Sequence, residues 1–170
     1  KEYDEEGELI FEGEYINGKK NGRGKEYNEG KLIFEGEYLY DHKRKGRSFI
    51  KGKLEYEGEY LCDKKWNGKG YDKKGKKIYE IKNGKGKVRE YNDVGELIFE
   101  GEYLNGRRNG KGIEYFKPGK IEFKGEYLDG KRWKGKSMEY DSDGESAFSG
   151  EYSGGDYKFD EKKINVIKYW

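Results

Sequence analysis

Phe11-Glu12-Gly13-Glu14-Tyr15 is the stretch that decides the fold, because the 170-residue chain repeats it. Close copies begin at five further positions: Phe34, Tyr56, Phe99, Phe123 and Phe148. The copies lie 22 to 25 residues apart, except for one gap of 43 residues before Phe99. A degenerate copy at 79–84, which has lost the Gly-Glu-Tyr segment, divides that gap. The chain therefore contains about seven units of one repeat.

Each unit predicts a β-hairpin. In the first copy Phe11, Gly13 and Tyr15 fall on one face of a strand, and the two glutamates fall on the other face. An Asn-, Gly- and Lys-rich loop is expected at 17–22, because Asn and Gly tolerate the positive φ angles of tight reversals. The chain then returns through 24–27, and a second turn that ends in glycine joins each unit to the next.

The composition supports stacked hairpins rather than an ordinary core. Charged residues make up 42% of the chain, hydrophobic residues 31%, and the mean hydropathy is −1.34. Such values are typical of disorder, but 16% of the residues are aromatic, which disordered chains avoid. A lone hairpin is marginal in water, so each aromatic face must pack on the next unit. We therefore predict an all-β fold: an elongated, single-layer, twisted stack of about seven antiparallel β-hairpins.

The repeats cover residues 1–152, and residues 153–170 leave the pattern. We interpret 153–170 as a C-terminal capping strand or tail, with the start of a further domain as the alternative. The first residues, Lys1-Glu2-Tyr3, match Lys25-Glu26-Tyr27 in the middle of a repeat. This match predicts that the sequence is a fragment of a longer protein.

The charge balance and the cysteine content bound the setting of the protein. Lys and Arg total 37 against 35 Asp and Glu, so the net charge of +2 gives no long-range attraction to nucleic acid. One cysteine, Cys62, rules out an internal disulfide framework. No apolar run has the length of a membrane span, and no N-terminal signal pattern is present. We expect an intracellular, cytoplasmic protein, with membrane association at its surface as an option.

No residue pattern predicts catalysis, so we expect a protein that is not an enzyme, with no catalytic, cofactor-binding or metal-binding residues. The segment 130–137 matches the phosphate-loop pattern GxxxxGK[ST], but it aligns with a hairpin turn of another copy and is expected to continue as a strand. The recurring glutamates belong to a repeated exposed face, whereas catalytic carboxylates are single and partly buried. His42 and Cys62 are single residues, which cannot form a metal cluster.

The pattern Tyr/Phe-x-Gly-Glu-Tyr, followed by Asn-Gly-Lys/Arg-x-Asn-Gly-Lys-Gly and a glycine turn, resembles the MORN (membrane occupation and recognition nexus) repeat. The resemblance covers about residues 1–152. The family has Trp after Gly-Glu, and this chain has Tyr there; the phrase at 31–38 is similar to variant repeats of bacterial and amoeboid proteins. The resemblance implies an extended hairpin stack with an aromatic groove, used as a scaffold or attachment module. It also implies binding of acidic phospholipids as a competing role.

The leading prediction is a non-catalytic repeat scaffold that mediates protein–protein interaction or self-association, including end-to-end dimers. Aromatic side chains are the expected contacts, because the edge of an aromatic groove can receive an extended peptide. The candidate partner-binding residues are Tyr15, Tyr38, Tyr60, Trp66, Tyr103, Tyr127 and Trp133.

Two alternatives remain: a regulatory module of an enzyme outside this fragment, and a peripheral membrane tether. Basic residues recur at the same end of successive hairpins and would align into one basic edge that meets acidic phospholipids. The candidate lipid-binding residues are Lys19, Lys20, Lys43, Arg44, Lys45, Lys64, Lys65, Arg107, Arg108, Lys131 and Arg132. No apolar residue is expected beside these loops to enter a bilayer, so solubility and pairing with glutamates compete with lipid binding.

Overall fold

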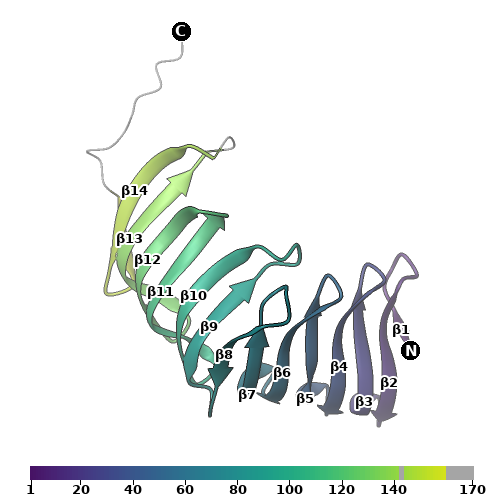
Figure 1. Ribbon diagram of the computed structural model, residues 1–170. Helices are drawn as coiled ribbons and strands as arrows, with labels where there is room; N and C mark the ends of the chain where they lie inside the picture. The colour runs from purple at the N-terminus through teal and green to yellow at the C-terminus, as the bar shows by residue number, and fades with distance from the viewer. Residues whose placement is uncertain (142–143, 160–170) are drawn as a thin grey trace.

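The computed structural model describes residues 1–141 and 144–159, and they form only β-strands and turns. The first sheet contains β1 (Glu2–Tyr3), β2 (Leu9–Ile16), β3 (Lys19–Asn28), β4 (Lys31–Leu39), β5 (His42–Ile50), β6 (Lys53–Leu61), β7 (Lys64–Tyr71) and β8 (Lys77–Ile81). The second contains β9 (Gly86–Tyr91), β10 (Leu97–Leu104), β11 (Arg107–Lys117), β12 (Lys120–Leu128), β13 (Lys131–Tyr140), β14 (Ser146–Ser153) and β15 (Asp156–Phe159). Within each sheet every strand pairs antiparallel with its neighbours in sequence, so the predicted hairpin stack is confirmed (Figure 1).

The hairpin turns are shorter than the sequence suggested. β2 ends at Ile16 and β3 begins at Lys19, so the first turn is only Asn17-Gly18, with φ angles of 50° and 76°. The predicted loop at 17–22 is therefore wrong in its length, and its last four residues belong to a strand. The reason is that two residues with positive φ complete a hairpin whose twist matches that of the strands.

The core is one row of aromatic rings on one face of the sheets. The first aromatic residue is 0–1% exposed in five copies; these residues are Phe11, Phe34, Tyr56, Phe99 and Phe123. The tyrosine of the following copy packs edge-on against such a ring, as between Phe11 and Tyr38, whose ring centroids lie 5.2 Å apart at 90°. Such edge-to-face pairs are a favoured aromatic geometry.

Each buried ring lies over two glycines, one in its own strand and one in the next. A Cβ atom added at Gly24 would lie 2.4 Å from Cζ of Phe11, and one at Gly13 would lie 2.8 Å from the same atom. These glycines face one another across the strands and form two rows. The rows are Gly13, Gly24, Gly36, Gly46, Gly58 and Gly68 in the first sheet, and Gly101, Gly112, Gly125 and Gly135 in the second.

The degenerate copy separates the two sheets. Ile81 and Val88 occupy the row positions opposite Gly68 and Gly101, and both side chains are buried, with 1% and 4% exposed. Aliphatic side chains there leave no flat floor for a ring, and an isolated bridge at 82–85 is what connects β8 to β9. The axis of the stack changes direction at this point (Figure 1).

The end of the repeat array lies in a strand. The predicted division between 1–152 and 153–170 falls at the end of β14, and β15 then pairs with β14. The rest of the predicted cap, residues 160–170, lies outside the described residues. No helix within the described ranges is long and apolar enough to cross a membrane.

The glycine rows predict that Gly101→Ala destabilises the fold by about 3 kcal/mol, because overpacking displaces neighbouring groups. The new Cβ would lie 2.6 Å from Cα of Gly112 and 2.7 Å from Cζ of Phe99. Gly119→Ala is the control, since nothing lies within 4 Å there and only its φ of 80° is unfavourable, at about 1 kcal/mol. Urea unfolding measures both variants. A loss at Gly101 no larger than the loss at Gly119 would contradict the close packing of the glycine row.

Candidate functional site

The hairpin turns at one end of the strands form a continuous surface, which we call the turn edge. It consists of the two-residue turns 17–18, 40–41, 62–63, 83–84, 105–106 and 129–130, all with positive φ angles. Backbone hydrogen bonds tie successive turns together. Asp41 N donates to Lys20 O at 2.9 Å, and Gly106 N donates to Gly84 O at 2.9 Å. The turn edge is therefore an ordered surface and not a set of independent loops.

The two basic residues that follow a turn point in opposite directions. Because the turns are short, these residues lie in strands, where side chains alternate between faces. In the first hairpin Lys20 pairs with Tyr15 on the aromatic face, and Lys19 pairs with Ile16 on the charged face. The same register recurs in β4–β5, β6–β7, β10–β11 and β12–β13.

The second basic residue of each pair belongs to the core. Its cationic group lies over the ring of the same unit, at 4.2 Å for Lys20 over Phe11 and 4.5 Å for Lys43 over Phe34. The same arrangement holds for Lys65, Arg108 and Arg132. Cation–π contacts of this kind are stronger where water is partly excluded.

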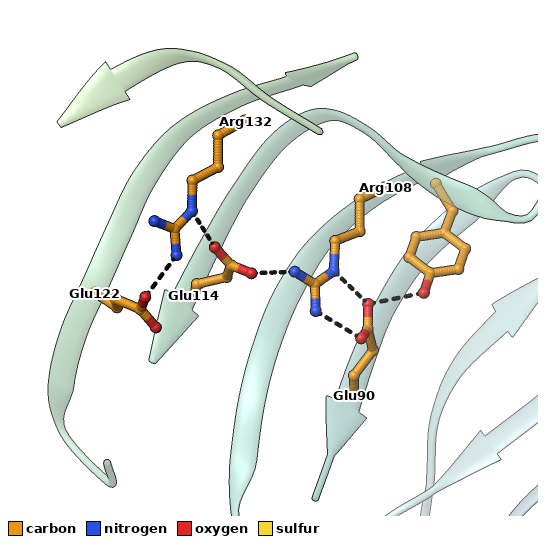
Figure 2. Close-up of polar contacts among 6 residues, drawn as sticks. Glu90, Arg108, Glu114, Glu122 and Arg132 are labelled. Carbon is orange, nitrogen blue, oxygen red and sulfur yellow. Dashed lines mark hydrogen bonds and ion pairs between the residues drawn. The ribbon is translucent and has the colours of Figure 1, made fainter. Parts of the chain in front are cut away.

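Carboxylates bind the cationic groups that lie over the rings, and we call this row of basic and acidic side chains the interior ladder (Figure 2). Arg108 donates to both oxygens of Glu90, at 2.9 and 2.8 Å, and also to Glu114. Arg132 then connects Glu114, at 2.5 Å, to Glu122, at 2.8 Å. The ladder holds neighbouring hairpins through charge-assisted bonds, which are stronger than neutral ones.

The interior ladder divides the predicted lipid-binding residues into two groups. In the first group the cationic group lies over a ring and forms an ion pair with a carboxylate; its members are Lys20, Lys43, Lys65, Arg108 and Arg132. The other predicted residues, Lys19, Arg44, Lys45, Lys64, Arg107 and Lys131, lie on the turn edge or the charged face. In the second group Lys64 is partly buried, and the other five residues are exposed.

An aliphatic row accompanies the outward basic residues. Its members are Ile16, Leu39, Leu61, Leu104 and Leu128, with 39–51% of their surface exposed. Each pairs across its hairpin with the first residue after the turn, which is Lys19, His42, Lys64, Arg107 or Lys131. The expectation that nothing apolar flanks these loops is therefore wrong. The signal was present in the sequence, because Leu or Ile follows Glu-Tyr in each of these copies.

The charges of the turn edge are mixed. His42 Nδ1 lies 2.6 Å from Asp63 Oδ2, and Arg107 Nη1 lies 2.6 Å from Asp129 Oδ2. These acidic residues come from the next turn along the stack. The turn edge is therefore amphipathic, with basic and acidic groups beside one aliphatic row.

The predicted partner-binding aromatics lie mainly in the core. Tyr38 and Tyr127 are 3% exposed, and Tyr15, Tyr60 and Tyr103 are partly buried beside the ring row. The two tryptophans are placed differently: they cover the turn that follows them. Trp66 is half-buried and lies against Gly84, whose N–H donates to Trp66 O at 2.8 Å. Trp133 lies near Gly155 and is 40% exposed, which makes it the most exposed aromatic of the predicted set.

The phosphate-loop pattern at 130–137 runs from a hairpin turn into strand β13. A helix N-terminus, which provides the phosphate site in true phosphate loops, does not follow it within the described residues.

A family model for the MORN repeat matches residues 11–31 and 99–121. The chain is a MORN repeat protein. The two matched MORN repeats share a local feature, a positive-φ glycine two residues before the row glycine of the second strand. Gly22 has a φ of 94° and Gly110 a φ of 89°, and each lies against a glutamate, Glu14 or Glu102. A search of curated proteins found no significant match.

Burial raises the pKa values of tyrosines in this MORN array. The pKa of Tyr15 rises to about 12 through burial and the carboxylate of Glu2, and that of Tyr115 to about 12 through burial and Glu100. Burial also raises the pKa values of Tyr38, Tyr60 and Tyr103. The neutral phenol is therefore the form that the folded state favours.

These shifts predict alkaline unfolding. Because the pKa values are higher in the folded chain than the ordinary value of about 10, the stability from neutral tyrosines is complete below about pH 10. It is lost as the pH rises through about 10 to 12 and above. We expect tyrosinate absorbance of the buried residues to appear together with loss of the β-sheet circular dichroism. Complete titration near pH 10 with an unchanged dichroism spectrum would contradict the buried aromatic row.

Proposed function

We propose that this MORN repeat protein is a non-catalytic scaffold that binds a protein partner, or a second copy of itself, through the turn edge. MORN repeats are modules of binding and interaction and are a non-enzymatic repeat type. The observation that supports this function is the row of five exposed aliphatic side chains at the turns. The row is separate from the core.

The geometry of the row favours an elongated protein contact. Neighbouring strands lie about 4.8 Å apart, so the aliphatic residues of successive hairpins recur about every 10 Å. Burying a leucine side chain contributes about 1.5 to 3 kcal/mol, so two or three of these contacts could anchor an interface. The acidic groups of Asp63 and Asp129 lie between the basic ones, which fits the polar rim of a protein interface.

A membrane surface is the second candidate partner. Aliphatic residues beside Lys19, Lys64 and Lys131 are the elements that an interfacial contact with an anionic membrane uses. The acidic residues of the turn edge oppose this role, because they offset the attraction to anionic headgroups. A cytoplasmic setting, with or without attachment to a membrane, belongs to this proposal.

Leu61→Asp and Leu104→Asp test the turn edge. Each is expected to weaken partner capture or concentration-dependent self-association by about tenfold, since burial of a leucine is lost. Val94→Asp is the matched control, because Val94 is 54% exposed but lies in the turn between β9 and β10, at the opposite end of the strands. Sedimentation velocity measures self-association, and affinity capture with each variant measures partner binding.

Sedimentation with phosphatidylserine-containing vesicles at physiological salt separates the two candidates. Vesicle binding that Leu61→Asp and Lys64→Ala both abolish, without any protein contact, would replace the protein scaffold by the membrane tether. If the leucine variants keep every contact that the Val94→Asp control keeps, the turn edge is not the binding surface.

A further inference from the structure

The glycine rows form the floor of a groove on the charged face of each sheet. In the second sheet the groove has a volume of about 1080 Å³, and it runs across the strands over Gly101, Gly112, Gly125 and Gly135. Side chains on either side of a glycine are two residues apart along a strand, so the two walls lie about 7 Å apart. Four strands give a floor about 14 Å long. These dimensions fit one extended polypeptide chain and are too narrow for a double helix.

The equivalent groove of the first sheet has walls in which acidic and basic residues alternate. Its volume is about 760 Å³. Glutamates and basic residues alternate from strand to strand along the walls: Glu35 faces Lys25 on one side and Arg47 on the other, and Glu37 faces Lys45. Arg47 Nη2 lies 2.5 Å from Glu35 Oε1. Opposite charges placed across strands stabilise the sheet, and the five basic residues that line this groove alternate with three glutamates.

The groove of the second sheet breaks that alternation at Lys124. This position, directly after the buried ring, is a glutamate in the repeats that begin at Phe11, Phe34, Tyr56 and Phe99. Lys124 instead faces Ile113 in β11 and Lys136 in β13. Like charges directly opposite each other are destabilising, so lysine in place of glutamate at this position lowers the stability of the unbound protein.

The whole groove is consequently basic. Eight lysine or arginine residues and three glutamates line it. Lys111 and Lys134 both face Glu126, and Glu151 is the other neighbour of Lys136. Within the described part of the chain, no ion pair involves Lys111, Lys124, Lys134 or Lys136. Four exposed lysines therefore surround a glycine floor with one carboxylate, Glu126, between them.

We propose that this groove binds an extended, acidic segment of a protein partner. Its carboxylates would supply the negative charge that Lys124 and Lys136 lack, and its backbone would lie close to the glycine floor. Ile113 on one wall provides an apolar contact for aliphatic side-chain carbons of the segment. Among the described residues, the walls between β10 and β13 contain no aromatic side chain on which the bases of a single-stranded nucleic acid could stack. The groove is a second contact surface, on the charged face rather than at the turn edge.

Lys124→Glu is the sharpest test, because it restores the glutamate that four other repeats have at this position. It should raise the melting temperature, since the new carboxylate would face Lys136, and it should weaken binding of a fluorescent octaglutamate peptide at least tenfold. Lys31→Glu is the control for net charge: Lys31 is exposed at the start of β4, away from the groove, and the substitution should leave affinity within twofold. Fluorescence anisotropy measures the Kd, which should rise with salt concentration.

Three results would overturn the proposal. The first is equal octaglutamate affinity in the wild-type chain and Lys124→Glu. The second is no binding of the peptide at low salt. The third is tighter binding of oligothymidylate or anionic vesicles than of the peptide, with the same loss in Lys124→Glu. The leucine variants of the turn edge should bind octaglutamate normally, so failure of the turn-edge function and failure of this groove are distinguishable.

Discussion

The contact of each buried ring with two glycines is the constraint on which the rest of the structure depends. Phe11 covers Gly13 in its own strand and Gly24 in the next, and the same relation recurs in the later units. A side chain at either glycine would lift the ring from the sheet. The row of rings then requires a row of glycines on the aromatic face. On the opposite face the backbone of the same row lies between charged side chains, because side chains alternate along each strand, and this alternation produces the grooves.

The chain has few aliphatic core residues, and ionic side chains contribute part of the packing and binding that holds the hairpins together. Lys20, Lys43 and Lys65 in the first sheet and two arginines in the second lie over the rings and bind carboxylates of the same hairpin or of the strand before it. This ladder explains how a chain with 31% hydrophobic residues can build an ordered stack. It also explains why a large share of the basic residues near the turns has no free charge to offer a ligand.

The sequence predicted the hairpin stack, because the period-two pattern around Phe11 and the recurrence of the unit depend only on local alternation. It did not predict the direction of Lys19 and Lys20. With a six-residue loop both would lie at the turn, whereas the two-residue turn Asn17-Gly18 places them on opposite faces of a strand. Side-chain direction therefore depended on the turn length. The charge reversal at Lys124 likewise acquired a meaning only when the register showed that it faces Lys136.

The most direct test of the account compares two adjacent arginines. Arg107 pairs with Asp129 in solvent, and Arg108 lies over Phe99 between Glu90 and Glu114. The free energy of unfolding should fall by about 2 to 4 kcal/mol in Arg108→Met, because two partly buried carboxylates lose their counterion. In Arg107→Met the free energy of unfolding should change by less than about 1 kcal/mol, because this ion pair is exposed. Equal effects of the two substitutions would contradict the claim that the second basic residue of each turn is part of the core.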